Sequence, residues 1–174
     1  LNSVTVGNYG GGQYYVHGDF GGPADSNGKV GYRVNLVRQD GDTAVDDQKI
    51  DRSLASAAFD FNVTDRFKLE LGASYGDYKM DAPNSYWFFR DGVSRPTLDT
   101  KKNWSQPWVR DETETRKWMA RATYEASDHL TLRVAHLREY QDRPVQYHTM
   151  NSVRSAGEYF QLRQKVGPTR TESE

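Results

Sequence analysis

The sequence contains no cysteine and no long apolar run, and both absences restrict what the protein can be. Without cysteine there is no disulfide framework, no thiolate nucleophile and no cysteine-based zinc site. No window approaches the roughly 18 apolar residues that a membrane-spanning helix needs. The first residues also lack the basic and then apolar layout of a signal peptide. A soluble protein, a mature protein after cleavage and a piece of a longer chain all fit these observations.

Apolar side chains are also scarce, with a hydrophobic share of 36% and a mean hydropathy of −0.89 over 174 residues. So few apolar residues do not favour a large conventional hydrophobic core. The net charge of −1 gives no sign of a nucleic-acid-binding surface, so no nucleic-acid partner is predicted. Aromatic residues reach 13% and glycine 15 residues, which together favour strands and turns over helices.

Apolar and polar residues alternate with a period of two, which predicts β-strands with one apolar and one polar face. In the clearest case Phe67, Leu69 and Leu71 oppose Lys68 and Glu70. Six stretches follow this rule: Gln13 to Phe20, Val30 to Arg38, Ala55 to Val63, Phe67 to Tyr75, Trp118 to Glu125 and Leu130 to Val134. The pattern predicts an all-β protein with antiparallel strands.

The connectors are short at one end of the predicted strands and long at the other. Residues 62–76 and 125–139 repeat one scheme, a three-residue polar turn followed by an alternating strand, with turns at Thr64 to Arg66 and Ser127 to His129. A modest connector spans Gly21 to Lys29, and three long ones are predicted at Gln39 to Ser53, Lys79 to Lys117 and Arg143 to Ala156. Tight turns at one end and long loops at the other are typical of outer-membrane barrels. The aromatic residues near strand ends, among them Tyr75 and Trp118, agree with rings at a bilayer boundary.

Two other architectures fit the same alternation. One is a complete small eight-stranded outer-membrane barrel with a structural or adhesion role. The other is a soluble, carbohydrate-binding β-sandwich, in which the apolar faces of Val30 to Leu36 and Phe67 to Leu71 would pack on each other.

Several segments, in this order and spacing, carry a family resemblance. They are the entry VTVGNYGGGQYYVHGDFGGPADSNGKVGYRVNLVRQDGDT, the hairpin around Thr64 to Arg66, and Asn103 to Trp108 before Glu112 to Thr115. With them, residues 1 to about 142 resemble the first part of the barrel of TonB-dependent outer-membrane receptors, most closely the siderophore-receptor group. The implied fold is an antiparallel up-and-down meander of about eight strands, a section of a transmembrane barrel of about 22 strands.

The resemblance also implies what the parent molecule does. Family members carry an energy-coupling box and a globular plug that this chain lacks, so residues 1–174 are expected to be a partial barrel domain. The implied function is binding and import of a ferric siderophore across the outer membrane of a Gram-negative bacterium, in contact with outer-membrane lipid. The TonB complex would act through the absent plug. No enzyme activity, cofactor or metal site is expected.

The largest predicted outward loop, Asp81 to Arg116, contains four consecutive aromatic residues. Aromatic rings give broad, rigid contact area, and a nearby guanidinium attracts anionic or carbonyl-rich groups. By the resemblance, the predicted ligand-binding residues are Tyr86, Trp87, Phe88 and Arg90. A competing interpretation is that the aromatic run continues the aromatic girdle at the membrane boundary or packs the loop onto itself. Trp104 and Trp108 are expected to fix the return of the loop to the barrel.

Overall fold

The computed structural model describes residues 2–95, 97–155 and 158–174. These residues form ten β-strands and no helix. In particular, no described helix is long and apolar enough to cross a membrane. The strands are β1 (Asn2–Gly7), β2 (Tyr14–Pro23), β3 (Val30–Asp42), β4 (Lys49–Thr64), β5 (Phe67–Asp81), β6 (Tyr86–Phe89), β7 (Arg110–Ser127), β8 (Leu130–Ser155), β9 (Glu158–Val166) and β10 (Thr169–Ser173).

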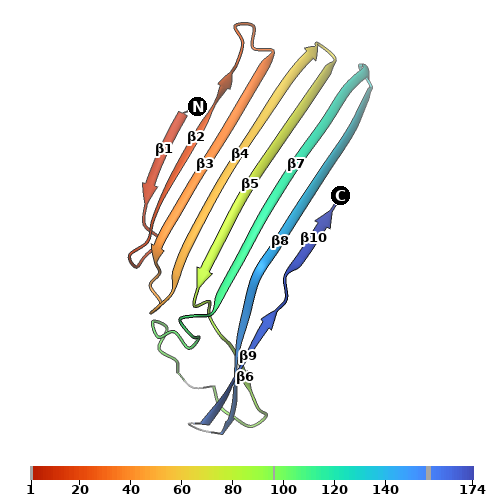
Figure 1. Cartoon of the computed structure of the whole chain (residues 1–174). Helices are drawn as coiled ribbons and strands as arrows, with labels where there is room; N and C mark the ends of the chain where they lie inside the picture. Colours follow the sequence, from red (N-terminus) through yellow and green to blue (C-terminus); the bar gives the residue numbers. More distant parts are fainter. Residues whose placement is uncertain (1, 96, 156–157) are drawn as a thin grey trace.

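All ten strands belong to one sheet, in the order β1-β2-β3-β4-β5-β7-β8-β10, with β6 and β9 also paired to β8. Every pairing is antiparallel except that of β6 with β8, which is parallel. The long strands lie side by side in one tilted layer, with the tight turns at the upper end and the long connectors at the lower end of Figure 1. Within the described residues β1 pairs only with β2, so the sheet is open and does not close into a small barrel.

The repeat seen in the sequence is a repeated hairpin. Thr64 pairs with Phe67 across one turn and Ser127 pairs with Leu130 across the other, each after a register shift of the same kind. The Thr64 hydroxyl accepts a hydrogen bond from the Arg66 N–H at 3.3 Å, and the Ser127 hydroxyl accepts one from the His129 N–H at 3.3 Å. Both turns are therefore built by the same side-chain-to-backbone contact.

One face of the sheet is apolar over most of its length, as the alternation predicts. Residues opposite each other in neighbouring strands share a face, and Ala57 lies opposite both Val34 and Ala73. The same face holds Val4, Val6, Val16, Phe20, Leu36, Phe59, Phe61, Leu69, Leu71, Trp118, Tyr124, Leu132 and Val134. The stretches Val30 to Leu36 and Phe67 to Leu71 thus lie in the same sheet, on either side of β4, and do not pack face to face, so the sandwich hypothesis is wrong.

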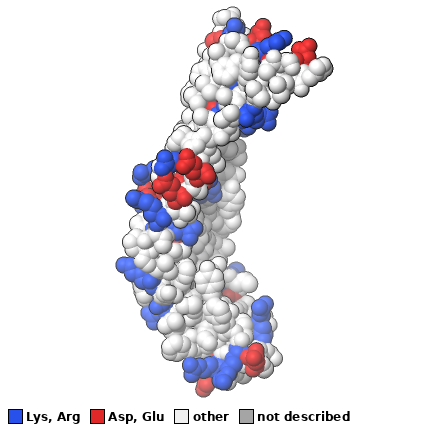
Figure 2. Space-filling model, turned by 90° about the vertical axis from the view of Figure 1, so that its right-hand side faces the viewer, with Lys and Arg blue, Asp and Glu red and all other residues white. Residues whose placement is uncertain are grey.

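This apolar face is uncovered. Val134 is 72% exposed, Val6 70% and Leu36 50%, whereas the buried hydrophobic residues of the described chain are Ala82, Val109 and Val153, all close to the longest connector. Viewed from the β10 side, charged residues gather at both ends and in the middle, with mainly uncharged surface between the turn end and the middle (Figure 2). Other residues of this face, among them Phe61 and Leu69, are half-buried by their neighbours within the sheet.

The predicted long loops are shorter than expected, because the strands continue after the alternation stops. β3 reaches Asp42 and β4 begins at Lys49, so the predicted loop of residues 39–53 shrinks to residues 43–48. Beyond Tyr75 the formerly apolar face becomes charged, and ion pairs hold the strands together: Arg38 with Asp51 at 2.5 Å and Arg110 with Asp81 at 2.7 Å. The predicted loop from Arg143 is part of β8, which runs on to Ser155.

β9 and β10 are one strand interrupted by Gly167 and Pro168. Gln146 pairs with Val166 and Arg143 pairs with Thr169, so two residues separate the pairs on each side and the register is unchanged. Pro168 stands opposite Pro144, and neither residue has an N–H to donate to the ladder. With β9 and β10 counted as one strand and β6 lying inside a connector, the sheet has eight strands, in agreement with the predicted number of about eight.

Ion pairs connect neighbouring strands on the polar face. Arg121 of β7 contacts both carboxylate oxygens of Glu70 in β5 at 2.5 Å. Lys68 lies 3.5 Å from Glu70 and 3.7 Å from Asp60 of β4. These contacts link three neighbouring strands on one side of the sheet.

Candidate functional site

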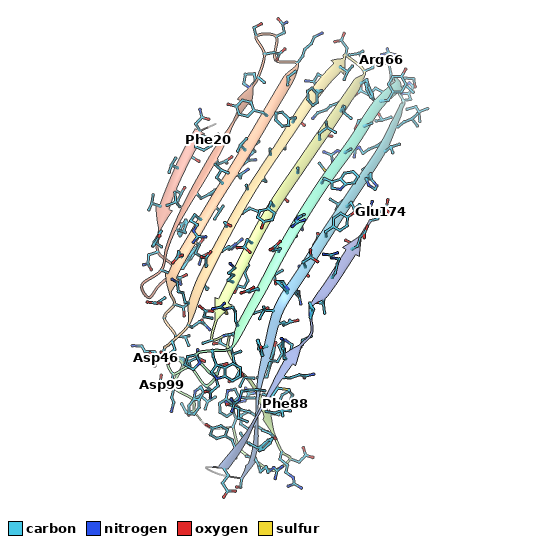
Figure 3. All side chains as sticks on the ribbon, viewed as in Figure 1. Phe20, Asp46, Arg66, Phe88, Asp99 and Glu174 are labelled. Atoms are coloured by element: carbon cyan, nitrogen blue, oxygen red, sulfur yellow. The ribbon has the colours of Figure 1, made fainter. Side chains whose placement is uncertain are left out.

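The candidate site is a three-stranded extension at the loop end of the sheet, where β6 takes the place of β7 beside β8. Tyr86 of β6 pairs with Met150 and Phe89 pairs with Val153. On the other side of β8, Met150 pairs with Leu162 of β9. Phe88 lies in this extension, and Asp46 and Asp99 of neighbouring connectors lie at the same end, opposite to Arg66 (Figure 3).

A buried polar network fixes the long connector of residues 82–109 onto β8 and β9. Asn151 is 0% exposed; its Nδ2 donates to the Ser85 hydroxyl at 2.8 Å, and its Oδ1 accepts from Gln161 Nε2 at 2.9 Å. Gln161 Nε2 also donates to the Trp104 carbonyl at 2.9 Å, and the hydroxyls of Ser105 and Thr149 lie 3.0 Å apart. These hydrogen bonds hold the loop against β8 and β9, although Nε1 of Trp104 is buried without a hydrogen-bond partner among the described residues.

The same connector is tied to the ends of β3, β4 and β5. Gln48 Nε2 donates to the Ala82 carbonyl at 3.2 Å, and Asn103 Nδ2 donates to the same carbonyl at 2.8 Å. The Asp46 N–H donates to the Lys101 carbonyl at 2.8 Å. The connector thus bridges the wall of the sheet and the extension.

One face of the extension packs against the connector through a cluster of aromatic rings, of which Tyr159 and Trp108 remain 51% and 56% exposed. Trp87 packs edge-on against Trp104, with ring centroids 5.4 Å apart, and lies 5.8 Å from Tyr159 of β9. Trp108 packs edge-on against Tyr147 of β8 at 5.9 Å. Trp104 and Trp108 therefore hold the loop against the extension, as the sequence predicts.

The other face is open. Tyr86 is 56% exposed, Phe88 55% and Phe160 of β9 55%. The Tyr86 ring lies 5.7 Å from the ring of His148. Residues two apart in a strand lie on the same face, so His148 and Gln146 of β8 share a face. Gln146 pairs with Asp111 of β7, which lies on the polar face of the sheet. The open face of the extension therefore continues the polar face.

Strand geometry therefore divides the predicted ligand-binding residues between two faces. Tyr86 and Phe88 lie on the open face, Trp87 lies in the covered aromatic cluster, and Arg90 is exposed just beyond β6, with its N–H bonded to the Val153 carbonyl at 3.1 Å. Sequence reasoning missed Phe160, because Glu158 to Lys165 alternates only loosely. Its pairing with Ser152 brings it beside β6 across β8.

The arrangement suits reversible binding. Tyr86 and Phe88 offer broad apolar contact with few rotatable bonds, and Arg90 offers guanidinium donors at their edge. Among the described residues, no group of three or more histidine, aspartate or glutamate side chains is placed to hold a metal ion.

Comparison with known proteins gives matches among solved structures alone. No family model and no curated protein sequence matches the chain. BauA, the ferric preacinetobactin receptor from Acinetobacter baumannii, superposes with a TM-score of 0.77 at 23% identity over 83% of this chain and 22% of the receptor. The ferripyoverdine receptor of the outer membrane of Pseudomonas aeruginosa gives 0.70 at 19% identity over 88% and 21%.

A third solved structure extends the likeness to another ligand class. The ferric-catecholate import receptor Fiu from Escherichia coli K12 gives a TM-score of 0.63 at 14% identity over 92% of this chain and 25% of the receptor. The chain thus has the fold of a section of a siderophore-receptor barrel, and it spans about a quarter or less of the length of these receptors. The proteins it resembles are transport receptors, not enzymes, and the resemblance seen in the sequence is confirmed at the level of the fold.

Proposed function

We propose that the chain is part of a TonB-dependent receptor in the outer membrane of a Gram-negative bacterium, which binds and imports a ferric siderophore without catalysing a reaction. The observation that carries this proposal is the uncovered apolar face of a sheet whose fold is that of receptor barrels. From Phe67 to Tyr75, eight residue steps of about 3.3 Å span roughly 27 Å of strand, or about 20 Å of bilayer at a tilt near 40°. This approaches the roughly 25 Å apolar band of membrane barrels.

In this arrangement hydrocarbon covers the apolar face and the polar face lines the interior. The tight turns at Thr64 and Ser127 lie on the periplasmic side, and the connector of residues 82–109 faces outward. Import would draw its energy from the TonB complex, which acts on a plug domain supplied by the parent molecule. The chain would then be a partial barrel domain throughout residues 1–174.

The ligand would bind on the open face of the extension, at Tyr86, Phe88 and Arg90. Trp87, although predicted as a ligand contact, would support this face from behind through its packing on Trp104. Because the open face continues the polar wall along β8, a ligand held there lies at the entrance of the interior. Strand alternation supports this division of roles, since neighbours in β6 cannot all face one ligand.

Binding measurements on the full-length protein in detergent would test the site. Tyr86→Ala combined with Phe88→Ala should weaken binding of a ferric siderophore about tenfold or more, because two aromatic contacts are lost. The panel would include ferric preacinetobactin, ferric pyoverdine and a ferric catecholate, read out by quenching of tryptophan fluorescence. Tyr9→Ala is the matched control, since Tyr9 is also exposed, at 65%, and lies in another connector at the same end.

If the double variant bound these complexes with unchanged affinity, the ligand would not bind on the open face. A wild-type protein that is monodisperse without detergent and binds no complex of the panel would overturn the receptor proposal itself.

A further inference from the structure

β8 passes from the wall of long strands into the extension, and its pairing with β7 is interrupted on the way. Glu112 pairs with Val145 and Glu114 pairs with Asp142, so β8 has one residue more than β7 at this level. Such a bulge leaves the ladder of hydrogen bonds locally incomplete and bends the strand. β8 changes direction as it passes from the wall into the extension (Figure 1).

The pairing on the other side of β8 is interrupted at the same level. Pro144 stands opposite Pro168, and neither residue has an N–H to donate. Gly167, between β9 and β10, is exposed, and no atom lies within 4 Å of the position that a Cβ would take there. Few hydrogen bonds therefore resist a change of angle between the wall and the extension at Pro144, Gly167 and Pro168, which we call the pivot.

The extension is tied to the wall a second time, through Ala82 at the start of the long connector. The Ala82 N–H donates to the Val109 carbonyl at 2.7 Å. The Ala82 carbonyl accepts from Gln48 Nε2 at 3.2 Å and from Asn103 Nδ2 at 2.8 Å. Ala82 is 1% exposed and Gln48 is 6% exposed, so these bonds are shielded from water. We call Gln48, Ala82 and Asn103 the latch.

The backbone is strained at the latch. Ala82 has a φ of 49°, and Asp47, which precedes Gln48, has a φ of 59°. These are the two non-glycine residues with positive φ in the described chain, and the hydrogen bond from Gln48 to Ala82 joins them. A Cβ makes this backbone conformation unfavourable, so it persists only where surrounding contacts hold it. At Ala82 the hydrogen bonds of the latch provide those contacts.

We propose that the extension turns on the wall at the pivot, and that Gln48 and Asn103 are positioning residues that set its orientation through Ala82. With the latch closed, the open face of the extension continues the polar face of the wall. Opening the latch relieves the strain at Ala82 and frees the connector, which is bonded to Asn151 of β8 and Gln161 of β9 and moves with them. Because strain and hydrogen bonds oppose each other, a second orientation is populated as a minor state. This inference goes beyond the proposed function and requires no ligand.

Distances between two spin labels on the full-length protein in detergent would test this. One label is placed at Asp65, exposed in a tight turn of the wall, and the other at Gln164, exposed in β9. The 174 residues contain no cysteine that would have to be removed before labelling. Gln48→Ala combined with Asn103→Ala should raise the population of a second distance about tenfold, because the Ala82 carbonyl loses both side-chain donors.

Two further variants should act in the opposite direction. Ala82→Gly adopts a positive φ without a steric penalty, so the second distance should be less populated than in the wild type. Pro144→Val combined with Pro168→Val returns the missing N–H groups to the ladder, and it should also reduce the second distance. This reduction should persist when the latch is opened by Gln48→Ala and Asn103→Ala, because the pivot itself is then stiffened.

Gln39→Ala is the matched control, because Gln39 is also a buried amide at the loop end, 8% exposed, and donates to Gln13 at 2.7 Å. It should leave the distance between Asp65 and Gln164 as in the wild type. Labels at Asp65 and Thr171, both on the wall, should give one distance in every variant.

A single distance between Asp65 and Gln164, unchanged in all variants, would overturn the inference. A second distance between Asp65 and Thr171 would also overturn it, because the wall itself would then loosen. The result is independent of the receptor function, since a protein that turns at the pivot and binds no siderophore would contradict the proposed function alone.

Discussion

Asn151 is the side chain on which the geometry of the site most depends. It is fully buried, and both ends of its amide are used, by Ser85 and by Gln161. Asn151→Ala would remove the donor to the Ser85 hydroxyl and one acceptor of Gln161, which keeps its bond to the Trp104 carbonyl, so we expect the extension to lose about 1–3 kcal/mol of stability. Hydrogen exchange of residues 82–109 should then become faster while the long strands stay protected.

Asn35→Ala is the control for this prediction. Asn35 makes one side-chain hydrogen bond, to His17 at 3.1 Å, on the polar face of the wall. Its loss should leave exchange in residues 82–109 unchanged. Equal exchange rates in Asn151→Ala and the wild type would show that the aromatic cluster alone holds the connector.

The aromatic run of the site could be predicted from the sequence, but its supports could not. Four adjacent aromatic residues in a long connector are conspicuous without a structure. Which of them face outward depends on the pairing of Tyr86 with Met150, 64 residues further along the chain, and no local pattern encodes that contact.

The two tight turns should be interchangeable, because both use a hydroxyl that accepts from the N–H two residues later. Thr64→Ser with Arg66→His converts the first turn into the second, and the free energy of unfolding should change by less than about 0.5 kcal/mol. The exposed contact between Arg66 and Asp128, at 3.8 Å, is lost in this variant and is worth little.

Thr64→Val is the contrasting variant. It keeps the shape of the side chain and removes the hydroxyl, so the Arg66 N–H loses its acceptor and stability should fall by about 0.5–1 kcal/mol. Denaturant unfolding of the full-length protein in detergent would measure both variants. A larger loss in the swapped turn than in Thr64→Val would contradict the role assigned to the hydroxyl.

The position and face of the main strands could be predicted from the sequence, whereas their ends could not. Alternation marks a strand only while one face is apolar, and β3, β4, β5 and β7 continue into a zone where both faces are polar. There the strands are held by ion pairs such as that of Arg110 with Asp81, which involve partners 29 residues apart. β1 has only Val4 and Val6 to mark it and was not predicted as a strand.

The open edges of the sheet bear on the whole molecule. The outer edges of β1 and of β9 with β10 have no neighbour within the described residues. In a bilayer each unpaired backbone group would cost several kcal/mol, so a lipid-facing sheet requires strands on both sides. This agrees with the proposal that the chain is a section of a wider barrel.

Whether lipid covers the apolar face of the sheet can be tested by introducing one charge on the apolar face and, separately, one on the polar face. Leu71 lies in the middle of the apolar face, 38% exposed, and Ser56 lies on the polar face, opposite Asn35 and Ser74. Leu71→Arg would place a guanidinium in hydrocarbon and should cost about 2–4 kcal/mol near the bilayer midplane. Ser56→Arg would place it in the wet interior and should cost less than about 1 kcal/mol. Urea unfolding of the full-length protein in lipid vesicles would compare the two variants, and a Leu71→Arg protein as stable as Ser56→Arg would mean that protein or water, and not lipid, covers the apolar face.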